Sequence, residues 1–417
     1  MNAIGKLRTL RKLSLLSILL VSFNTAVAQT SYRVTDLGAL HDGVFGCAMG
    51  LNNKGWTESM DGFLDESGNF VGRAVINVDG LKIDLGTLGG RDSWINWGGI
   101  NEQGEAVGLA ETAAPDPDGE DFCGFGTNLT CRPFVWQNGE LRALPTLGGN
   151  NGLATAINNR GQIAGTAQTT VTDSGCPPYQ ISAAAVWEKG KVQQLPTVAG
   201  DPDGFALGIN DLGQIVGGTG TCSAGDLHAV LWENGNVIEL PNLGSISFGN
   251  EAFAINNRGE IVGEVSSSDG TTFYAALWHN GTVTNLGTLP EDFAAIATDI
   301  NDKGQVVGST LDSNLNWSHA FIWQNGVMTD LNMLFPADSN LYATMANQIN
   351  SRGQISGMAT VLSGPDAGNI HAFLATPVNA SVGESIASIA VTHPRPTLPT
   401  NVGKQLLKRL GLGRFRQ

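Results

Sequence analysis

Apolar and polar residues alternate in short segments along most of the chain, and turn-forming residues separate these segments. In "HAVLWENGNVIEL", residues 228–240, an Asn-Gly pair stands between two alternating runs. Two antiparallel strands joined by a two-residue turn have this pattern. The pair recurs at 138–139, 280–281 and 325–326, with Asp79-Gly80 and Lys189-Gly190 as variants. The pattern therefore predicts a series of β-hairpins.

A second motif, "INDLGQIVG" at 209–217, also repeats along the chain. Its Ile ends one strand, its Asn side chain caps a turn, and its Gly takes a positive φ before the next strand begins. The motif places one Asn in each unit, and the spacings between these residues run from 45 to 57. The positions are Asn52, Asn101, Asn158, Asn210, Asn256, Asn301 and Asn350.

Each repeat unit is long enough for four strands, because two strands flank each of the two kinds of turn. A blade of a β-propeller is a sheet of four antiparallel strands. The N-terminal "YRVTDLGAL" at 32–40 corresponds to a fourth strand with nothing before it, and "HAFLATPV" at 371–378 to a third strand with nothing after it. We expect 32–38 to pair with 371–377, because this pairing leaves no open sheet edge. The predicted fold is all-β, a seven-bladed β-propeller of four-stranded antiparallel blades that the N-terminal strand closes.

The units resemble the HAF repeat of bacterial extracellular proteins, which is named for the His-Ala-Phe sequence present here at 319–321 and 371–373. The resemblance covers roughly residues 31–378. It implies a secreted, β-propeller-like repeat protein and carries no established activity.

The first 28 residues have the pattern of a secretory signal peptide. Basic residues precede an apolar run at 13–23, and Ala26-Val27-Ala28 is a small-x-small cleavage pattern. We therefore divide the chain into a signal peptide at 1–28, a propeller at 29–378 and a basic tail at 379–417. We expect the protein to be secreted or periplasmic, without a transmembrane segment, and the tail to be disordered. The alternative for the tail is a short basic helix that contacts an acidic partner or the cell envelope.

The charge balance excludes nucleic acid as the expected partner. The chain has 38 acidic and 23 basic residues and a formal net charge of −15. A surface of this charge repels polyanions.

Two repeated side chains resemble ligand-binding groups but are better explained by structure. A Trp recurs on the third strand of five units, where we expect it to pack between blades. Histidines recur four residues before the Trp position, on different blades and away from the axis, so they cannot converge on one metal ion. We expect them to bond to an adjoining loop. The residues are Trp136, Trp187, Trp232, Trp278, Trp323, His228, His319 and His371.

Every long insertion falls on one face of the predicted ring, between second and third strands or between blades. The main insertions are 109–131, 166–182 and 218–227. Five cysteines lie on that face, which in an exported chain makes them disulfide candidates. Cys123 and Cys131 share one loop, Cys176 and Cys222 lie in equivalent loops of neighbouring units, and Cys47 is left over; other pairings remain open.

Two loops on this face are rich in aspartate, with "DPDGED" at 116–121 and "DPDG" at 201–204. Clustered carboxylates suit Ca²⁺, but Asp-Pro and Asp-Gly are also ordinary turn formers. We expect no cofactor, with calcium as the one candidate metal. Its candidate ligands are Asp116, Asp118, Asp121, Asp201 and Asp203.

Trp94 and Trp97 are aromatic residues outside the repeating Trp position. In an alignment with the next unit, Trp94 corresponds to Asn151 and Trp97 corresponds to Ala154. We expect them, with Asp92, to contribute a ligand surface at the mouth of the ring. The alternative is that both Trp residues pack under the loop 109–131.

The sequence contains no recognisable catalytic motif, neither a nucleophile elbow nor a phosphate-binding loop. We therefore expect a monomeric, non-catalytic binding or structural module whose ligand is an extracellular glycan or protein. The alternative is a propeller enzyme, a hydrolase or lyase, that acts on extracellular polysaccharide. Such an enzyme needs a pair of titratable groups with shifted pKa values in one cavity, and the sequence alone does not single out such a pair among its many carboxylates.

Overall fold

A computed structural model describes residues 30–95, 97–222, 227–247 and 249–378. The expected signal peptide and C-terminal tail lie outside these residues. The described chain is all-β. It contains strands β1 to β28 and two short 3-10 helices, η1 (Leu40–Asp42) and η2 (Leu331–Leu334). No helix within the described ranges combines the length and the apolar character that crossing a membrane requires.

Five antiparallel sheets contain four strands each. The first two of these sheets contain β6 (Gly89–Trp94), β7 (Ala106–Pro115), β8 (Leu129–Gln137) and β9 (Glu140–Ala143), and then β10 (Gly148–Ile157), β11 (Ile163–Thr172), β12 (Gln180–Glu188) and β13 (Lys191–Gln194). The next two contain β14 (Asp203–Ile209), β15 (Ile215–Gly220), β16 (Leu227–Glu233) and β17 (Asn236–Glu239), and then β18 (Glu251–Ile255), β19 (Ile261–Ser266), β20 (Phe273–His279) and β21 (Thr282–Gly287). The fifth contains β22 (Ala294–Ile300), β23 (Val306–Leu311), β24 (Trp317–Gln324) and β25 (Val327–Asp330).

The remaining eight strands form two antiparallel groups of four, which meet at one parallel bridge between Phe45 and Ile370. One group is β2 (Phe45–Leu51), β3 (Thr57–Leu64), β4 (Phe70–Val78) and β5 (Leu81–Asp84). The other is β26 (Leu341–Ile349), β27 (Ile355–Val361), β28 (Ile370–Val378) and β1 (Ser31–Gly38).

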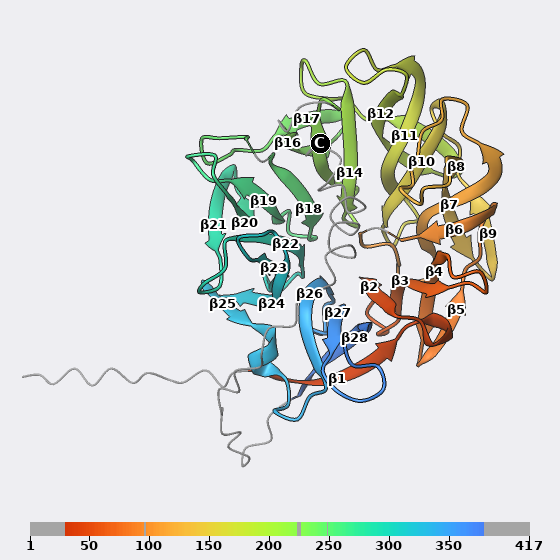
Figure 1. Ribbon diagram of the computed structural model, residues 1–417. Coiled ribbons are helices and arrows are strands. Elements are labelled where there is room, and N and C mark those ends of the chain that lie inside the picture. Colours follow the sequence, from red (N-terminus) through yellow and green to blue (C-terminus); the bar gives the residue numbers. More distant parts are fainter. Residues whose placement is uncertain (1–29, 96, 223–226, 248, 379–417) are drawn as a thin grey trace, which may run out of the picture.

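The sheets stand around a common centre, with strands such as β14, β18, β22 and β26 facing it (Figure 1). Four-stranded antiparallel sheets arranged in this way form a β-propeller. The first strand of each group is the inner one and the fourth is the outer one (Figure 1). Residues from all parts of the chain therefore converge only along the axis.

The N-terminal and C-terminal strands pair as the repeat pattern predicts. β1 lies antiparallel to β28, with Tyr32 opposite Pro377 and Asp36 opposite Phe373. Tyr32 is buried, and it packs in a core cluster with Val361 and Ala375.

The hairpin turns have the backbone geometry that their residues predict. Asn138 and Gly139 have φ values of 54° and 84°, and Lys189 and Gly190 have 51° and 76°. Two successive positive φ values define the type I′ turn, which matches the twist of paired strands. The short turns therefore hold the outer strands in register without a longer loop.

Candidate functional site

The Asn of the repeat motif makes two kinds of hydrogen bond. The Oδ1 of Asn210 accepts the backbone N–H groups of Leu212 and Gln214, which caps the turn as predicted. Its Nδ2 donates to the carbonyl oxygen of Asn256 in the next sheet, at 3.0 Å. Each Asn of the motif donates to the following one in the same way, and Asn350 donates to the carbonyl of Asn52 at 3.1 Å. These bonds connect successive sheets.

The histidines of the third strands each bond to a carboxylate, which for His228 and His319 belongs to an adjoining loop, as predicted. The Nδ1 of His228 lies 2.9 Å from the Oδ2 of Asp201, and that of His319 lies 2.7 Å from the Oδ2 of Asp292. His371 makes the same contact with Asp36 of β1, at 3.0 Å. Because each histidine has its own carboxylate partner, none of them shares a site with another.

Three of the five repeated Trp residues join neighbouring sheets, as predicted. Their Nε1 groups donate to the carbonyl oxygens of prolines that follow the fourth strand of the preceding sheet. The pairs are Trp187 with Pro145 at 2.7 Å, Trp232 with Pro196 at 2.6 Å and Trp278 with Pro241 at 2.7 Å.

Both expected disulfides are present. Cys123 pairs with Cys131 within one loop, and Cys176 pairs with Cys222 between the loops of neighbouring sheets. Cys47 is free and fully buried. The two disulfides are compatible with an extracellular or periplasmic protein.

Trp94 is buried beneath the long loop 109–131, with 3% of its surface exposed. Its ring is parallel to that of Phe45, at 6.3 Å between centroids. Phe125 of the long loop meets it edge-on at 6.1 Å. In this arrangement a ligand reaches the Trp94 ring only after the loop moves.

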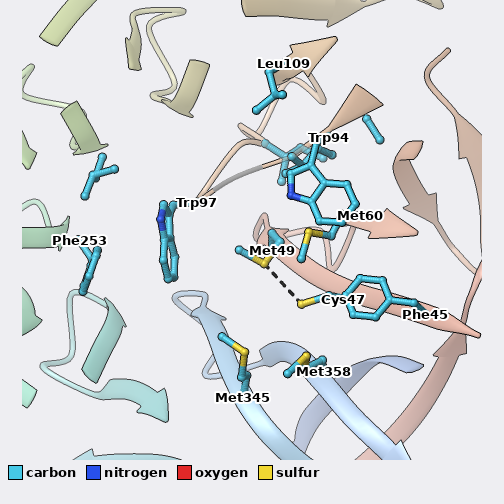
Figure 2. Close-up of a cluster of buried hydrophobic side chains, with 14 of the residues drawn as sticks. Phe45, Cys47, Met49, Met60, Trp94, Trp97, Leu109, Phe253, Met345 and Met358 are labelled. Carbon is cyan, nitrogen blue, oxygen red and sulfur yellow. Dashed lines mark hydrogen bonds between the residues drawn. The ribbon is translucent and has the colours of Figure 1, made fainter. Parts of the chain in front are cut away.

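Trp97 lies on the ring axis. Its ring stacks on Phe253 of β18 at 5.0 Å between centroids, and each side chain is 2% exposed. Trp97 follows β6, so the contact joins parts of the ring that are not neighbours, as Figure 2 shows. The stack fills the centre of the propeller at this level.

Asp92 and Glu111 form a buried pair near Trp94. The Oδ1 of Asp92 accepts the N–H of Gly72 at 2.6 Å, and its Oδ2 accepts from the Nε of Arg91 at 2.7 Å. The backbone N–H of Asp92 donates to the carboxylate of Glu111. Burial raises the pKa of Glu111. Asp92 therefore links three strands instead of facing solvent.

The carboxylates of the 116–121 loop have partners within the protein. The Oδ1 of Asp116 accepts the N–H groups of Asp118 and Glu120, and its Oδ2 accepts from Asn151 at 2.7 Å. Asp118 accepts from Asn150 at 2.9 Å. Asp121 accepts the N–H of Gly126 at 3.0 Å. The five calcium candidates are thus divided between this loop and a separate cluster around residues 201–203.

The second cluster contains a pair of buried carboxyl groups. Asp201 bonds to His228 and Thr219, whereas Asp203 accepts the N–H of Ser182 at 2.8 Å. Burial, with the nearby Asp173 carboxylate, raises the pKa of Asp203 to about 7. Asp173 also lies beside Cys176 and Cys222. These two sulfur atoms are joined to each other, which removes them as metal ligands.

A further carboxyl group lies on the inner strands, nearer the Asn turns than the Trp97 stack. The position two residues before the motif Asn is Gly or Ala in five units. It is Asp299 on β22 and Gln348 on β26 in the other two. Asp299 is partly exposed, and its Oδ2 accepts the N–H of Ile349 at 2.7 Å. Desolvation raises the pKa of Asp299 to about 7.

Glu58 of β3 adds a second carboxyl group to this level of the ring. It lies between Gly50 and Gly99, and a Cβ at Gly99 would overlap its Oε2. Both carboxylate oxygens are buried without a hydrogen-bond partner among the described residues. Burial raises the Glu58 pKa well above its usual value. The nearby N–H of Val107 lowers the pKa, but by a smaller amount than burial raises it. Because the equivalent residues of other units are mainly Val or Ala, Glu58 replaces an apolar packing residue.

Three polar side chains therefore lie on successive sheets at one level along the axis: Asp299, Gln348 and Glu58. The other inner-strand positions at this level are Gly or Ala. Burial raises the pKa of both carboxyl groups, that of Asp299 to about 7. An acid or base with a pKa near the working pH is efficient in proton transfer. No motif marks these residues in the sequence, although an alignment of the repeat units shows departures from Gly or Ala at 299 and 348.

No family model matches the chain, and no curated protein matches it. Similar solved structures include the β-propeller domain of the Trilobed protease from Pyrococcus furiosus, at 10% identity and a TM-score of 0.49 over 85% of this chain and 98% of that one. An acylaminoacyl peptidase of Pyrococcus horikoshii has 14% identity and a TM-score of 0.43 over 75% and 50%. A gluconolactonase of Xanthomonas campestris has 10% identity and a TM-score of 0.37 over 85% and 93%.

These neighbours correct our expectation of a non-catalytic binding or structural module, since all three are enzymes or parts of enzymes. At 10–14% identity the likeness concerns the scaffold alone. The likeness therefore assigns no activity to this chain, and an activity depends on its own side chains.

Proposed function

We propose that the chain is an exported enzyme, a hydrolase or lyase that acts on extracellular polysaccharide. Its scaffold is a seven-bladed propeller that spans residues 29–378, belongs with HAF-repeat proteins and is closed by β1. The pairing of β1 with β28 supports closure, and so does the bond from Asn350 to the carbonyl of Asn52.

The observation that carries the proposal is the polar arc formed by Glu58, Asp299 and Gln348. Cleavage of a glycosidic bond, by water or by elimination, requires one group to give a proton and another to take one. Asp299 is partly exposed on the axis, so it is the group that meets the substrate. Gln348 offers both a donor and an acceptor to sugar hydroxyls.

The two carboxyl groups differ in their surroundings, which separates their roles. Asp299 accepts the backbone N–H of Ile349 and is partly exposed, so its proton exchanges with the substrate. Glu58 is buried between Gly50 and Gly99, and this burial raises its pKa, which favours its protonated form. Two carboxyl groups in different surroundings are the usual basis for dividing acid and base roles.

The test is to incubate the purified chain with acidic and neutral polysaccharides and measure new reducing ends and new unsaturated ends. Asp299→Asn should reduce the rate at least about 100-fold, the usual contribution of acid–base catalysis. Asp338→Asn, which changes an exposed carboxylate, is the control and should retain full activity. An active protein whose rate Asp299→Asn leaves unchanged contradicts the proposed site.

A further inference from the structure

Sulfur-containing side chains gather on one side of the axis, where the sheets of β2 and β26 meet. Cys47, Met49 and Met60 come from β2 and β3, and Met345 and Met358 come from β26 and β27. All five are fully buried in one core cluster. Figure 2 shows their sulfur atoms turned toward the same region, beside Trp97. Four of the seven methionines of the chain therefore share one buried cluster with its only free thiol.

The centre of the cluster is defined by three polar or sulfur atoms. The Sγ of Cys47 lies 3.5 Å from the Sδ of Met49. The Nδ2 of Asn347 lies 3.3 Å from each of these sulfur atoms and donates to the carbonyl of Ala48 at 2.8 Å. The Oδ1 of Asn347 is buried and has no hydrogen-bond partner in the described part of the chain.

Asn347 exceeds what the fold needs at this position. The equivalent residues Thr155 and Thr298 bond to the carbonyl of the next inner strand with a hydroxyl alone. Asn347 makes that same bond to Ala48 and in addition directs its amide at the sulfur atoms. Leaving a buried amide oxygen without a partner is destabilising, and the bond to Ala48 alone does not require an amide.

We propose that this cluster binds a soft monovalent metal ion, Cu(I), through the thiolate of Cys47 and the thioethers of Met49 and its neighbours. Thiolate and thioether ligands select Cu(I) among the common metals. Sulfur atoms 3.5 Å apart can both contact one ion at metal–sulfur distances of roughly 2.3 Å. The Asn347 amide then donates to the bound thiolate, as outer partners of metal ligands do.

The charge balance favours a monovalent ion. Binding replaces the Cys47 S–H proton, which leaves for solvent, so Cu⁺ and thiolate together are neutral. Zn²⁺ with the same ligands would leave one positive charge in an apolar site, which is costly. The ordinary role of Met in cores is to fill irregular gaps. That role accounts for one or two methionines but not for their grouping with a free thiol and an amide.

The purified full chain is titrated with Cu(I) under anaerobic ascorbate against a competing Cu(I) chelator. We expect one ion per chain, with thiolate-to-metal absorption in the near ultraviolet. Cys47→Ala should abolish retention, and Met49→Leu should weaken it at least tenfold. Met333→Leu, at an exposed methionine, is the matched control and should bind as the unaltered chain does.

Met→Leu preserves side-chain volume, so Met49→Leu and the pair Met345→Leu with Met358→Leu decide the outcome even if Cys47→Ala fails to fold. Failure of the unaltered chain to retain Cu(I) overturns the proposal. Equal retention by a folded Cys47→Ala variant overturns it as well. Equally tight retention of Zn²⁺ overturns the assignment to a soft monovalent ion.

Discussion

Two arcs of the propeller use the same repeat differently. In the arc of β10 to β21, the axial positions follow the repeat, with Ala156, Gly208 and Ala254 two residues before the motif Asn. In the arc from β22 through β26 to β2, the corresponding region contains Asp299, Gln348 and the buried Glu58. The sulfur cluster lies in this second arc too. The contrast shows that repetition maintains the ring, while chemistry depends on where repetition stops.

The Asn bonds are common to both arcs, so the departures do not weaken the connections between sheets. Asn301 and Asn350 in the polar arc donate at 3.0 and 3.1 Å, the same range as Asn158 and Asn210 at 3.0 Å in the regular arc. The polar groups are therefore held on a rigid support, which functional groups need if their geometry is to persist.

The largest expected effect is the loss of the strand that joins the two chain ends in the polar arc. Deleting Ser31–Gly38 removes the partner of β28 and the buried Tyr32. We expect the melting temperature, followed by circular dichroism, to fall by more than about 10 °C, since many hydrogen bonds and a core side chain are lost together. Arg33→Ala, at an exposed position of the same strand, should melt like the unaltered chain. Equal melting after the deletion contradicts closure by β1.

The axial stack that separates the two arcs gives the next effect. Trp97→Ala leaves a cavity against Phe253 and should cost about 3–5 kcal/mol of unfolding free energy, measured by denaturant titration. Trp94→Ala should have a similar cost, because Trp94 packs between Phe45 and Phe125. A loss of unfolding free energy below about 1 kcal/mol in a folded variant contradicts this packing role and favours a ligand-binding role for these residues.

The regular arc is tested by Asn210→Asp. Aspartate keeps the acceptor that caps the turn but has no donor for the carbonyl of Asn256. We expect a loss of about 2 kcal/mol in unfolding free energy, because a buried carbonyl loses its donor and faces a charge. Asn236→Asp, at an exposed Asn outside the motif, should cost little. Equal stability of the two variants means that the Asn bonds contribute little to the ring.

The polar arc should show a pH dependence that Asp299→Asn removes. The folded chain holds the Asp299 proton up to about pH 7, whereas the ordinary pKa is 3.8. Stability therefore falls as pH rises from 4 to 7, and the full penalty is present above pH 7. Asp299→Asn should stabilise the protein by on the order of 2 kcal/mol at pH 8 and by much less at pH 4. Asp338→Asn should show no such difference, and a pH-independent effect at 299 contradicts the raised pKa.

The smallest effect concerns calcium at the loop-rich face. Asp116 already accepts two backbone N–H groups and the amide of Asn151, so a calcium ion would have to displace them. We expect calcium or a chelator to change the melting temperature by less than about 1 °C, because RT ln(1 + [L]/Kd) is small for a weak site. A clear rise with calcium that Asp116→Asn abolishes makes this loop a metal site.

Part of the site was readable in the sequence. The Cys176–Cys222 disulfide, the structural histidines and the packing of the repeated Trp follow from equivalent positions in successive units, and the Cys123–Cys131 disulfide follows from proximity within one loop. The capping role of the motif Asn was also readable, because Asn is an ordinary turn-capping residue, and its Oδ1 caps the turn as expected. The direction of its Nδ2 toward the next sheet was not readable, because it depends on how two sheets lie side by side.

The sequence by itself determined the strand order, the turns and the pairing of the chain ends, because these depend on local periodicity and on one repeat matched to the next. Only the tertiary structure decided that Trp97 meets Phe253, and that Asn347 meets Cys47 across 300 residues. Likewise, the raised pKa of Asp299 requires a ring of surrounding protein. Such contacts depend on curvature and desolvation, which arise only when every sheet faces the same axis.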